Sequence, residues 1–430
     1  MKKFLLAGCA AAALAAVCGS ASAADSTPGK FDIKIGGDAY FTAGYVHQNR
    51  DSALTLNDQN VDFANRARLV ITPTATANNG MEYGANLRIR AWNSTGTVDA
   101  DQAYIFAGGT WGRVEAGLNA GPNNQYGITA PSGFGTGGVM GDWAEGNGWL
   151  QNQNTFLEAV FGGGFNNVTN TNWATRLNYF TPRLFAQEDA NTGLLAMVSF
   201  APQNINVGTA VSRTGRATVT GGNGDSVCGY TTAAAPLQGC GWKNVVEAGL
   251  RYDGSFRGVT ISSSVGYEHG DAPTPAPGAG IAYFNDLDAF QVGFQVGYAG
   301  FLVGGSYLNA GKSGYTKAAV APGAGGPVRQ RTAQTTYTGG ISYETGPVVV
   351  GFNYAHGEDA GQLSLPGSRT ADLYSVGATY TLSPGFTTSI EYLRSSTSNQ
   401  TGLTSDYVGG NGLAGSGNAN LFLWKNMITF

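Results

Sequence analysis

The stretch MEYGANLRIRAW, residues 81–92, alternates between two kinds of side chain. Its odd positions hold Met, Tyr, Ala, Leu, Ile and Ala, whereas its even positions include Glu82, Asn86, Arg88 and Arg90. A period of two is typical of a β-strand, because successive side chains of a strand point to opposite faces. One face of this strand is therefore apolar, and the other bears polar and charged groups.

The same two-residue period recurs along the chain. Short turns, such as ANNG at 77–80 and LSPG at 382–385, alternate with long Gly-rich links, such as 119–171. This alternation predicts antiparallel hairpins, about sixteen strands in all, with tight turns at one end and long loops at the other. The further alternating stretches are 33–45, 63–71, 246–252, 259–267, 290–298, 348–354, 374–380 and 386–392.

The composition distinguishes between a soluble sandwich and a membrane barrel. Charged residues make up 12% of the chain, whereas ordinary soluble domains have about 25%. The apolar faces often end on an aromatic residue, and the opposite faces hold Arg, Glu, Asn and Gln. This inside-out pattern predicts an all-β, transmembrane, antiparallel up-and-down β-barrel. A barrel of about sixteen strands encloses an aqueous lumen.

The first residues predict a cleaved secretory signal peptide, residues 1–23. Lys2 and Lys3 form its positive start, an apolar run follows, and Ala-Ser-Ala at 21–23 provides the small residues of a cleavage site. A rival interpretation is lipidation at Cys9, which ends the sequence Leu-Ala-Gly-Cys. The apolar run continues past Cys9, and this favours cleavage after residue 23.

Cleavage would leave a single barrel domain, residues 24–430. Loss of Lys2 and Lys3 leaves 22 basic and 28 acidic residues, a net charge of −6. This acidic balance argues against nucleic acid as a partner. Cys228 and Cys240 remain in a Gly/Thr-rich loop. We expect these two cysteines to form a disulfide, because an exported chain meets oxidising conditions.

The sequence at the C-terminus, LFLWKNMITF (421–430), also alternates. Phe422, Trp424, Ile428 and Phe430 share one face. If this strand pairs with the first strand to close the barrel, then the terminal residue is structural. Asn426 interrupts the apolar face. It would face a neighbouring subunit, or the register would shift by one residue there.

Two longer stretches and the terminal residue resemble one known family. They are AYIFAGGTWGRVEAGLNAGPNNQYG (103–127), NWATRLNYFTPRL (172–184) and Phe430. Together they are similar to the general diffusion porins of the Gram-negative outer membrane. The resemblance implies a sixteen-stranded barrel in the cell outer membrane, usually a homotrimer, whose long third loop (119–171) folds into the lumen and narrows it. It also implies that Phe430 is recognised by the outer-membrane assembly machinery.

The chain departs from the family pattern at one place. The family often has Gly-Arg-Gln where this chain has Gly117-Leu118-Asn119, so an expected pore arginine is missing. The resemblance implies no enzymatic activity and no cofactor. Calcium bound by acidic loop residues is a family feature that the sequence leaves open.

Two groups of charged residues are predicted to form the pore constriction. Their opposed charges would create a transverse field that orients dipolar solutes. The basic wall consists of Arg66, Arg68, Arg88, Arg90 and Arg176. The acidic loop group consists of Asp142, Glu145 and Glu158.

We therefore predict a water-filled channel for passive diffusion of ions and small hydrophilic solutes. The first alternative is a substrate-selective channel for a sugar or an anion. A barrel enzyme is a more remote alternative, because it needs a His beside a carboxylate or a Ser. The polar clusters 268–271 and 356–359 are its candidates. An adhesin is equally remote, since it does not require a long third loop.

Overall fold

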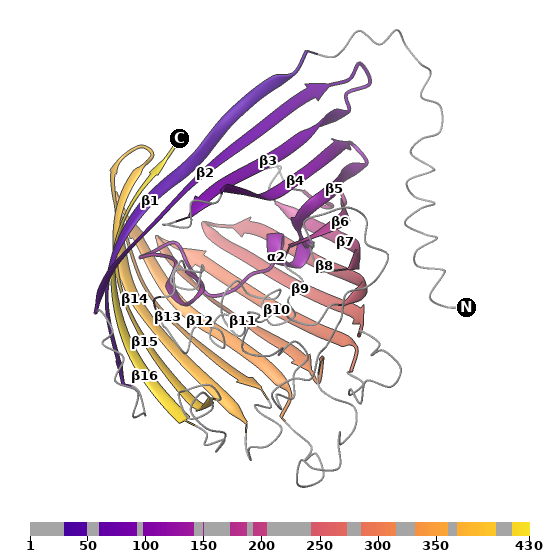
Figure 1. Ribbon diagram of the computed structural model, residues 1–430. Helices are drawn as coiled ribbons and strands as arrows, with labels where there is room; N and C mark the ends of the chain where they lie inside the picture. Colours follow the sequence, from indigo (N-terminus) through magenta and orange to yellow (C-terminus); the bar gives the residue numbers. More distant parts are fainter. Residues whose placement is uncertain are drawn as a thin grey trace.

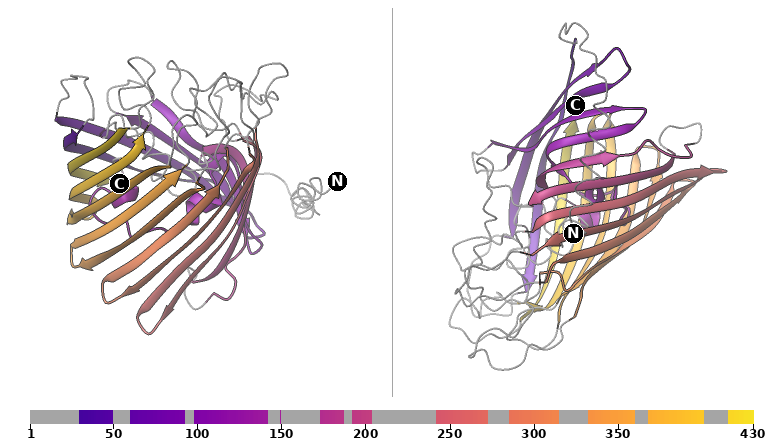
Figure 2. Two further views of the ribbon diagram at one scale, coloured as in Figure 1. Left: turned by 90° about the horizontal axis from the view of Figure 1, so that it is seen from below. Right: turned by 90° about the vertical axis from the view of Figure 1, so that its right-hand side faces the viewer.

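The computed structural model describes residues 30–49, 60–92, 98–141, 149, 173–186, 192–203, 242–272, 285–314, 332–359, 368–400 and 415–430. Within these residues, sixteen antiparallel strands close into one barrel, as predicted (Figure 1). The strands tilt around the enclosed space in every view (Figure 2). They are β1 (Asp32–Asn49), β2 (Val61–Thr76), β3 (Glu82–Trp92), β4 (Val98–Gly109), β5 (Gly112–Ala120), β6 (Trp173–Phe180), β7 (Gly193–Gln203), β8 (Lys243–Phe256), β9 (Val259–Asp271), β10 (Leu287–Tyr298), β11 (Phe301–Gly311), β12 (Gln334–Thr345), β13 (Val348–Asp359), β14 (Arg369–Ser383), β15 (Phe386–Gln400) and β16 (Gly415–Thr429).

Each strand pairs with the next along the chain, and β1 pairs with β16 to complete the ring. The β1–β16 register runs from Asp38 opposite Thr429 to Asn49 opposite Asn418. Beyond it, the Gly37 amide donates to the Phe430 carbonyl at 2.8 Å, and the Phe430 amide donates back to Gly37 at 3.1 Å. Phe430 therefore belongs to the closing seam, and closure leaves no unpaired strand edge.

The tight turns at one end of the barrel follow from local backbone chemistry. Arg257 and Gly258, between β8 and β9, have φ of 51° and 81°. Ala299 and Gly300, between β10 and β11, have φ of 49° and 85°. Two successive residues at positive φ form a type I′ turn, whose twist matches that of the flanking strands. The second position is glycine in both turns, because glycine adopts positive φ without a steric cost.

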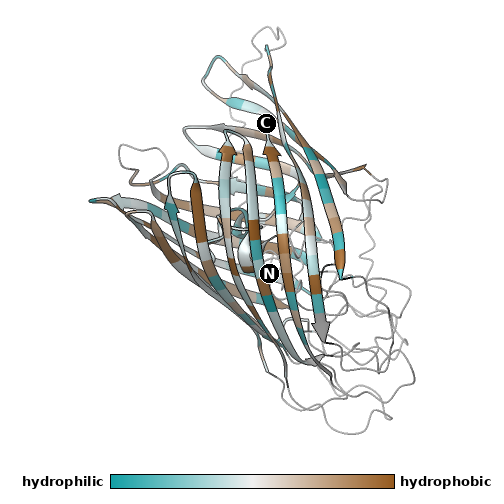
Figure 3. Ribbon diagram, turned by 90° about the vertical axis from the view of Figure 1, so that its left-hand side faces the viewer, coloured by the Kyte–Doolittle hydropathy of each residue, from teal (hydrophilic) through white to brown (hydrophobic). Residues whose placement is uncertain are grey.

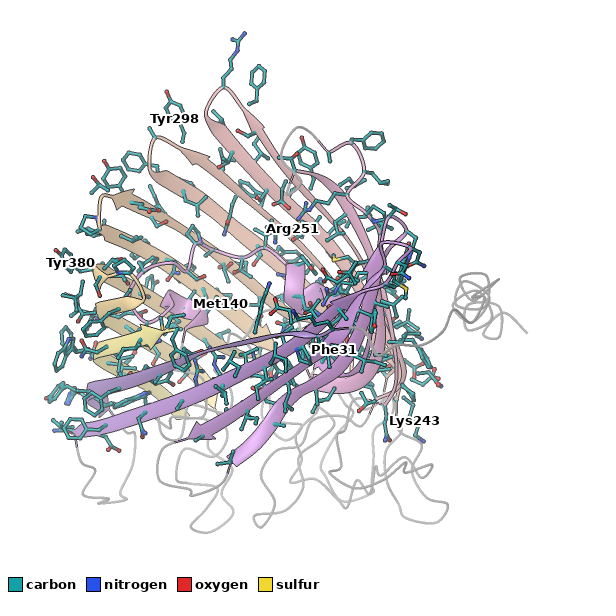
Figure 4. All side chains as sticks on the ribbon, turned by 90° about the horizontal axis from the view of Figure 1, so that it is seen from above. Phe31, Met140, Lys243, Arg251, Tyr298 and Tyr380 are labelled. Atoms are coloured by element: carbon teal, nitrogen blue, oxygen red, sulfur yellow. The ribbon has the colours of Figure 1, made fainter. Side chains whose placement is uncertain are left out.

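Hydrophobic and hydrophilic residues follow one another in bands along the strands (Figure 3), and burial assigns the two kinds to different faces of the wall. Large apolar side chains are exposed on the outer face, where Phe294 and Tyr298 are 55% and 62% exposed. Figure 4 shows Tyr298 and Tyr380 at the periphery, whereas Met140 and Arg251 lie within the ring of strands. The inner face is polar over much of its area. The wall is thus apolar toward its surroundings and polar toward its interior.

Helices are few in the described residues. They are α2 (Pro122–Tyr126) and the short 3₁₀ helix η1 (Gly138–Met140), both after β5. In the part of the chain that the structure describes, no helix is both long and apolar enough to cross a bilayer.

Two apolar clusters lie on the inner face toward the long-loop end. The two clusters lie on different strands, so the inner face is less polar at this end of the barrel than elsewhere. The first consists of Ala64, Val139, Trp149, Ala355, Ala371, Leu373, Leu393, Ala419, Leu421 and Leu423. The second consists of Ala174, Ala201, Trp242, Val245, Leu287, Ala289, Leu308 and Ala310.

Candidate pore-lining site

Arg66 and Arg68 lie on the inner face of β2, and both pair with a carboxylate of β1. Arg66 Nη2 lies 3.3 Å from Asp38 Oδ1, and Arg68 Nη2 lies 2.7 Å from Asp38 Oδ2. The β1–β2 register explains this, because Asp38 is directly opposite Arg68 and two residues from the position opposite Arg66. One carboxylate therefore lies between two guanidinium groups.

Arg88 and Arg90 lie on the inner face of β3 and share a second carboxylate. Arg88 binds Asp101 through two contacts of 2.7 Å, from Nε to Oδ1 and from Nη2 to Oδ2. Arg90 Nη1 lies 3.3 Å from Asp101 Oδ2. Arg90 is also directly opposite Arg68 across the β2–β3 pair. The two carboxylates, one on β1 and one on β4, therefore offset part of the repulsion among four guanidinium groups on β2 and β3.

Asp101 reaches the inner face because of a β-bulge. Arg88 pairs with Gln102 and Ile89 pairs with Ala100, so Asp101 is the extra residue of β4. Gln102 also points inward, since it accepts a hydrogen bond from Asn86 at 3.3 Å. Strict alternation would therefore place Asp101 on the outer face. A bulge redirects a side chain in this way, and sequence alternation alone could not reveal it.

Arg176, the fifth predicted wall arginine, also points inward from β6. Its guanidinium contacts Glu247 of β8, and both side chains are almost completely buried. Nη1 also donates to Ser199 Oγ at 3.3 Å. The amide of Asn123 in α2 donates to the same Glu247 carboxylate at 3.3 Å. Glu247 therefore links α2 to the wall, and Arg176, which pairs with Glu247, presents little surface to the open interior.

Three further arginines belong to the wall and were not among the predicted residues. Arg113 Nε lies 2.9 Å from Glu115 Oε1 within β5. Arg251 Nε and Arg183 Nη1 both lie 2.8 Å from Asp253 Oδ2. The pair Arg251–Asp253 could have been found from the sequence. In β8 these two residues alternate with the outward Leu250 and Tyr252, so alternation places them on the inner face.

Lys425 of β16 adds another positive charge to the inner face. Its Nζ lies 4.5 Å from the centre of the Tyr40 ring, and Arg66 Cζ lies 4.7 Å from the same centre. Tyr40 is almost completely buried. A ring between two cations attracts both through its negative face. This contact extends the basic wall from β2 across β1 to β16.

The described ion pairs of arginine have an excess of positive charge: eight arginines share five carboxylates. In most pairs the arginine side chain is also the more exposed partner. Arg88 and Arg90 are 18% and 28% exposed, whereas Asp101 is 6% exposed. Arg68 is 24% exposed and Asp38 is 15% exposed, although Arg66 is buried. Within these ion pairs, the guanidinium groups therefore form most of the surface that meets water.

The segment after β5, residues 121–141, is called here the inner segment, because it contacts inward-facing side chains of the wall. The amide of Ile128 donates to Ser264 Oγ at 2.9 Å, and the amide of Ala130 donates to Thr338 Oγ1 at 3.0 Å. Burial and the nearby Glu115 carboxylate raise the pKa of the Tyr126 hydroxyl, so this group stays neutral. The first half of the inner segment thus lies along β9 and β12.

The second half of the inner segment lies against β13 and β15. The amide of Val139 donates to Asn353 Oδ1 at 3.1 Å, and Asn353 Nδ2 donates to the Pro131 carbonyl at 2.9 Å. Thr136 Oγ1 donates to the buried Glu391 carboxylate at 2.6 Å. These hydrogen bonds satisfy backbone groups that would otherwise be buried without partners.

Phe134 fixes the position of the inner segment by packing. Its side chain is fully buried, and a Cβ added to Gly351 would lie 2.1 Å from Phe134 Cδ1. Trp149, later in the same loop, packs against Gly44 of β1 in a similar way. Only a residue without a Cβ leaves room for these rings.

Several predicted residues lie outside the described residues. These are Asp142, Glu145 and Glu158 of the acidic loop group, and Cys228 and Cys240 of the predicted disulfide. Their positions relative to the wall arginines, and the disulfide itself, therefore stay predictions.

The histidines that suggested an enzyme lie on the outer face in hydrogen-bonded pairs. His269 Nδ1 is 2.8 Å from Asp288 Oδ1, which also accepts a hydrogen bond from the Tyr267 hydroxyl at 2.7 Å. His356 Nδ1 is 2.8 Å from Asp372 Oδ1. Over the described ranges, no three His, Cys, Asp or Glu side chains are grouped so that they could hold a metal ion.

Comparison with known proteins supplies the family. A model of the Gram-negative porins matches residues 10–400. An uncharacterized protein of Rickettsia prowazekii (strain Madrid E) is 25% identical over 405 residues, which cover 82% of this chain and 83% of the relative. An uncharacterized protein of Rickettsia felis is 24% identical over 405 residues, which cover 82% of this chain and 84% of the relative.

Solved structures show the same architecture. The anion-selective porin from Comamonas acidovorans is similar with a TM-score of 0.54 and 15% identity, over 93% of this chain and all (100%) of that chain. OmpT, an outer-membrane protein of Vibrio cholerae in its trimer form, is similar with a TM-score of 0.53 and 10% identity, over 93% of this chain and 99% of that chain. At these identities, the likeness concerns the fold.

Proposed function

Because this chain belongs to the Gram-negative porin family, whose members are outer-membrane β-barrels, we propose that it forms a water-filled channel for passive diffusion of ions and small hydrophilic solutes. The closed barrel and its polar inner face support this function. Solvated charges line such a lumen at little cost, whereas the apolar outer face suits the membrane interior. The cell outer membrane is the location that family and fold indicate.

We further propose that the channel prefers anions. The observation that supports this preference is the arginine excess, because eight arginines share five carboxylates and are mostly the more exposed partners. A wall of one sign of charge raises the local concentration of ions of the opposite sign. Of the two selective alternatives, a sugar channel and an anion channel, this wall favours the anion.

The narrow part of the path is proposed to lie between the loop 119–171 and the arginines of β2 and β3. The inner segment makes hydrogen bonds to β5, from which it follows, and to strands from β8 to β15. Arg68 and Arg90 lie on the other side of the ring, on strands that these bonds do not reach. In this arrangement Asp142, Glu145 and Glu158 would face the basic wall across the open path.

The remaining expectations are part of the same proposal. Residues 1–23 are removed as a signal peptide, residues 24–430 form the barrel, and Cys228 forms a disulfide with Cys240. The mature chain assembles as a homotrimer in outer-membrane lipid, and the trimer form of the Vibrio cholerae OmpT supports this assembly. Phe430 acts as the signal that the assembly machinery recognises.

Single-channel recording in planar bilayers tests the function directly. We expect large current steps in groups of three, with a conductance that rises linearly with salt concentration. Under a KCl gradient, the reversal potential should have the sign expected when chloride is more permeant than potassium. Small steps that one sugar blocks would instead show a sugar-selective channel. Well-folded protein that gives no steps would contradict the channel.

Neutralising the four arginines of β2 and β3 tests the anion preference. Replacing Arg66, Arg68, Arg88 and Arg90 by Gln leaves Asp38 and Asp101 uncompensated, so the reversal potential should change toward cation preference. Arg257→Gln provides the control, because Arg257 lies in a tight turn outside the lumen. An unchanged reversal potential in the fourfold variant would contradict the role of this wall.

A further inference from the structure

An open groove lies on the outer face of the barrel, mainly over β12 to β15. Its volume is about 590 Å³. Val350 of β13 and Ala378 of β14, which lie directly opposite each other, are short side chains within it. The other outward side chains that line the groove are aliphatic or aromatic, and they include Ile341, Phe352, Val376, Ile390, Tyr392 and Phe422. Since the outer face of a membrane barrel meets lipid, a groove of this composition suits a hydrocarbon chain.

Tyrosine rings follow the groove toward the long-loop end. Two residues beyond Phe352 and Val376, the same face bears Tyr354 and Tyr374, which lie opposite each other with ring centres 4.8 Å apart. Gly339 of β12 lies on the other side of Tyr354, and a Cβ added there would have no other atom within 4 Å, so space remains open beside this ring. Tyrosine rings are typical of the interface between membrane and water. These rings therefore mark the level of the lipid headgroups on the side of the long loops.

Arg394 of β15 brings a guanidinium group to this level of the outer face. It follows Ile390 and Tyr392 on the same face, and these two side chains are 50% and 41% exposed. Arg394 is itself exposed and lies directly opposite Tyr374, in a part of the β14–β15 pairing without a register shift. A positive charge therefore lies at one end of the apolar groove, beside the tyrosine rings.

The groups around Arg394 leave its charge without a carboxylate partner among the described residues. Asp372 of β14 is already engaged, because it accepts a hydrogen bond from the Tyr354 hydroxyl at 2.5 Å and lies 2.8 Å from His356 Nδ1. On β16, the residue opposite Arg394 is the neutral Asn420. A guanidinium group at the membrane surface attracts anionic lipid, and its planar fork of donors matches a phosphate.

We propose that the groove and Arg394, called here the lipid site, bind one anionic lipid. Arg394 binds its phosphate at the level of Tyr374, and the groove holds an acyl chain. Ala378 lies four residues from Tyr374 along β14, so this part of the site extends about 13 Å into the membrane. The lipid site lies outside the lumen and does not depend on what the channel passes. It requires only the membrane location that the family and the fold establish.

Fluorescence quenching by brominated acyl chains tests the lipid site. Phe352→Trp places an indole in the groove, and the difference from the parent fluorescence isolates it from the seven native tryptophans. The full-length protein is reconstituted in phosphatidylcholine vesicles that contain brominated phosphatidylglycerol or brominated phosphatidylcholine. We expect this indole to prefer the anionic lipid about fivefold. Phe294→Trp is the matched reporter, since Phe294 is 55% exposed on the outer face of β10. Both lipids should quench it equally.

Substitutions of Arg394 in the Phe352→Trp background identify the group that binds the phosphate. Arg394→Gln should abolish the preference for phosphatidylglycerol, whereas Arg394→Lys keeps the charge and should retain most of it. Arg257→Gln removes the same charge from a tight turn at the opposite end of the barrel, and it should leave the preference unchanged. None of these changes should alter the single-channel conductance.

Three results would overturn the lipid site. The first is equal quenching of the Phe352→Trp indole by the two lipids, which needs no substitution of Arg394. The second is a preference that persists in Arg394→Gln. The third is an indole that neither lipid quenches at Phe352→Trp although both quench it at Phe294→Trp, because a protein neighbour would then cover the groove.

Discussion

Asp101 shows how strongly one residue can determine the charge of the pore wall. Its carboxylate binds Arg88 through two short contacts and also reaches Arg90. It offsets one of the two positive charges on β3 and holds both guanidinium groups in place. Asp101 points inward because it is itself the extra residue of the β-bulge in β4.

Asp101→Asn should increase the preference for anions and lower the stability of the barrel. The variant leaves the charges of Arg88 and Arg90 unopposed, so the reversal potential should move further toward that of chloride. The loss of charge-assisted hydrogen bonds should cost about 1–3 kcal/mol. Single-channel recording measures the first effect, and unfolding in detergent with denaturant measures the second.

Asp288→Asn is the control for this prediction, because Asp288 is exposed on the outer face beside His269. It changes the net charge equally, but it should leave the reversal potential unchanged. Equal shifts in the two variants would show that overall charge, and not the pore wall, sets the selectivity.

At the scale of elements, the inner segment is held by fit as much as by hydrogen bonds. Phe134 occupies space that exists because Gly351 has no side chain. Gly339, a glycine in the middle of β12, has free space beside it instead. A Cβ added to Gly339 would have no other atom within 4 Å.

Gly351→Ala should displace the inner segment, whereas Gly339→Ala should not. The added methyl group overlaps Phe134, and such overpacking should cost about 1–3 kcal/mol. If the inner segment narrows the path, its displacement should raise the single-channel conductance and the open-channel noise. Equal conductance in the two variants would contradict the role of Phe134 in positioning the segment.

The sequence predicted the elements better than their contacts. Alternation gives the face of each side chain, and it placed Arg66, Arg68, Arg88, Arg90 and Arg176 on the inner face. It does not give the partner across the strand, because pairing depends on register. For this reason it missed Asp38 and Asp101 as partners of those arginines. The burial of Arg176 was missed as well, since it depends on α2, which belongs to a loop without a period.

For the whole molecule, closure makes the last residue part of the wall. Phe430 exchanges two backbone hydrogen bonds with Gly37, and its ring is exposed on the outer face. Closure was predictable from the alternation of the last ten residues. The register at Asn426 was left open by the sequence, and the unshifted β1–β16 pairing places this residue on the outer face with Trp424 and Ile428, so a register shift there is wrong.

Removal of Phe430 should slow assembly and lower the yield of folded barrel. The truncated chain loses both hydrogen bonds to Gly37 and the terminal ring. Folded barrels resist unheated detergent, so the folded fraction is measured by the shift in electrophoretic mobility on heating. Phe430→Tyr keeps the backbone and an aromatic ring, and it should assemble normally. A truncated chain that assembles at the parent rate would contradict the role of this residue.

The pairing of β1 with β16 also has a consequence for the order of events during folding. Hairpins between successive strands can form as soon as both strands are available, but the seam joins residues at opposite ends of the barrel sequence. Contacts of such high sequence separation form slowly. Until the seam forms, an incomplete sheet has two open edges that can pair with other chains. The time between export and closure is therefore when the protein is most prone to aggregation, and a partner that covers β1 or β16 during that time would act as a chaperone.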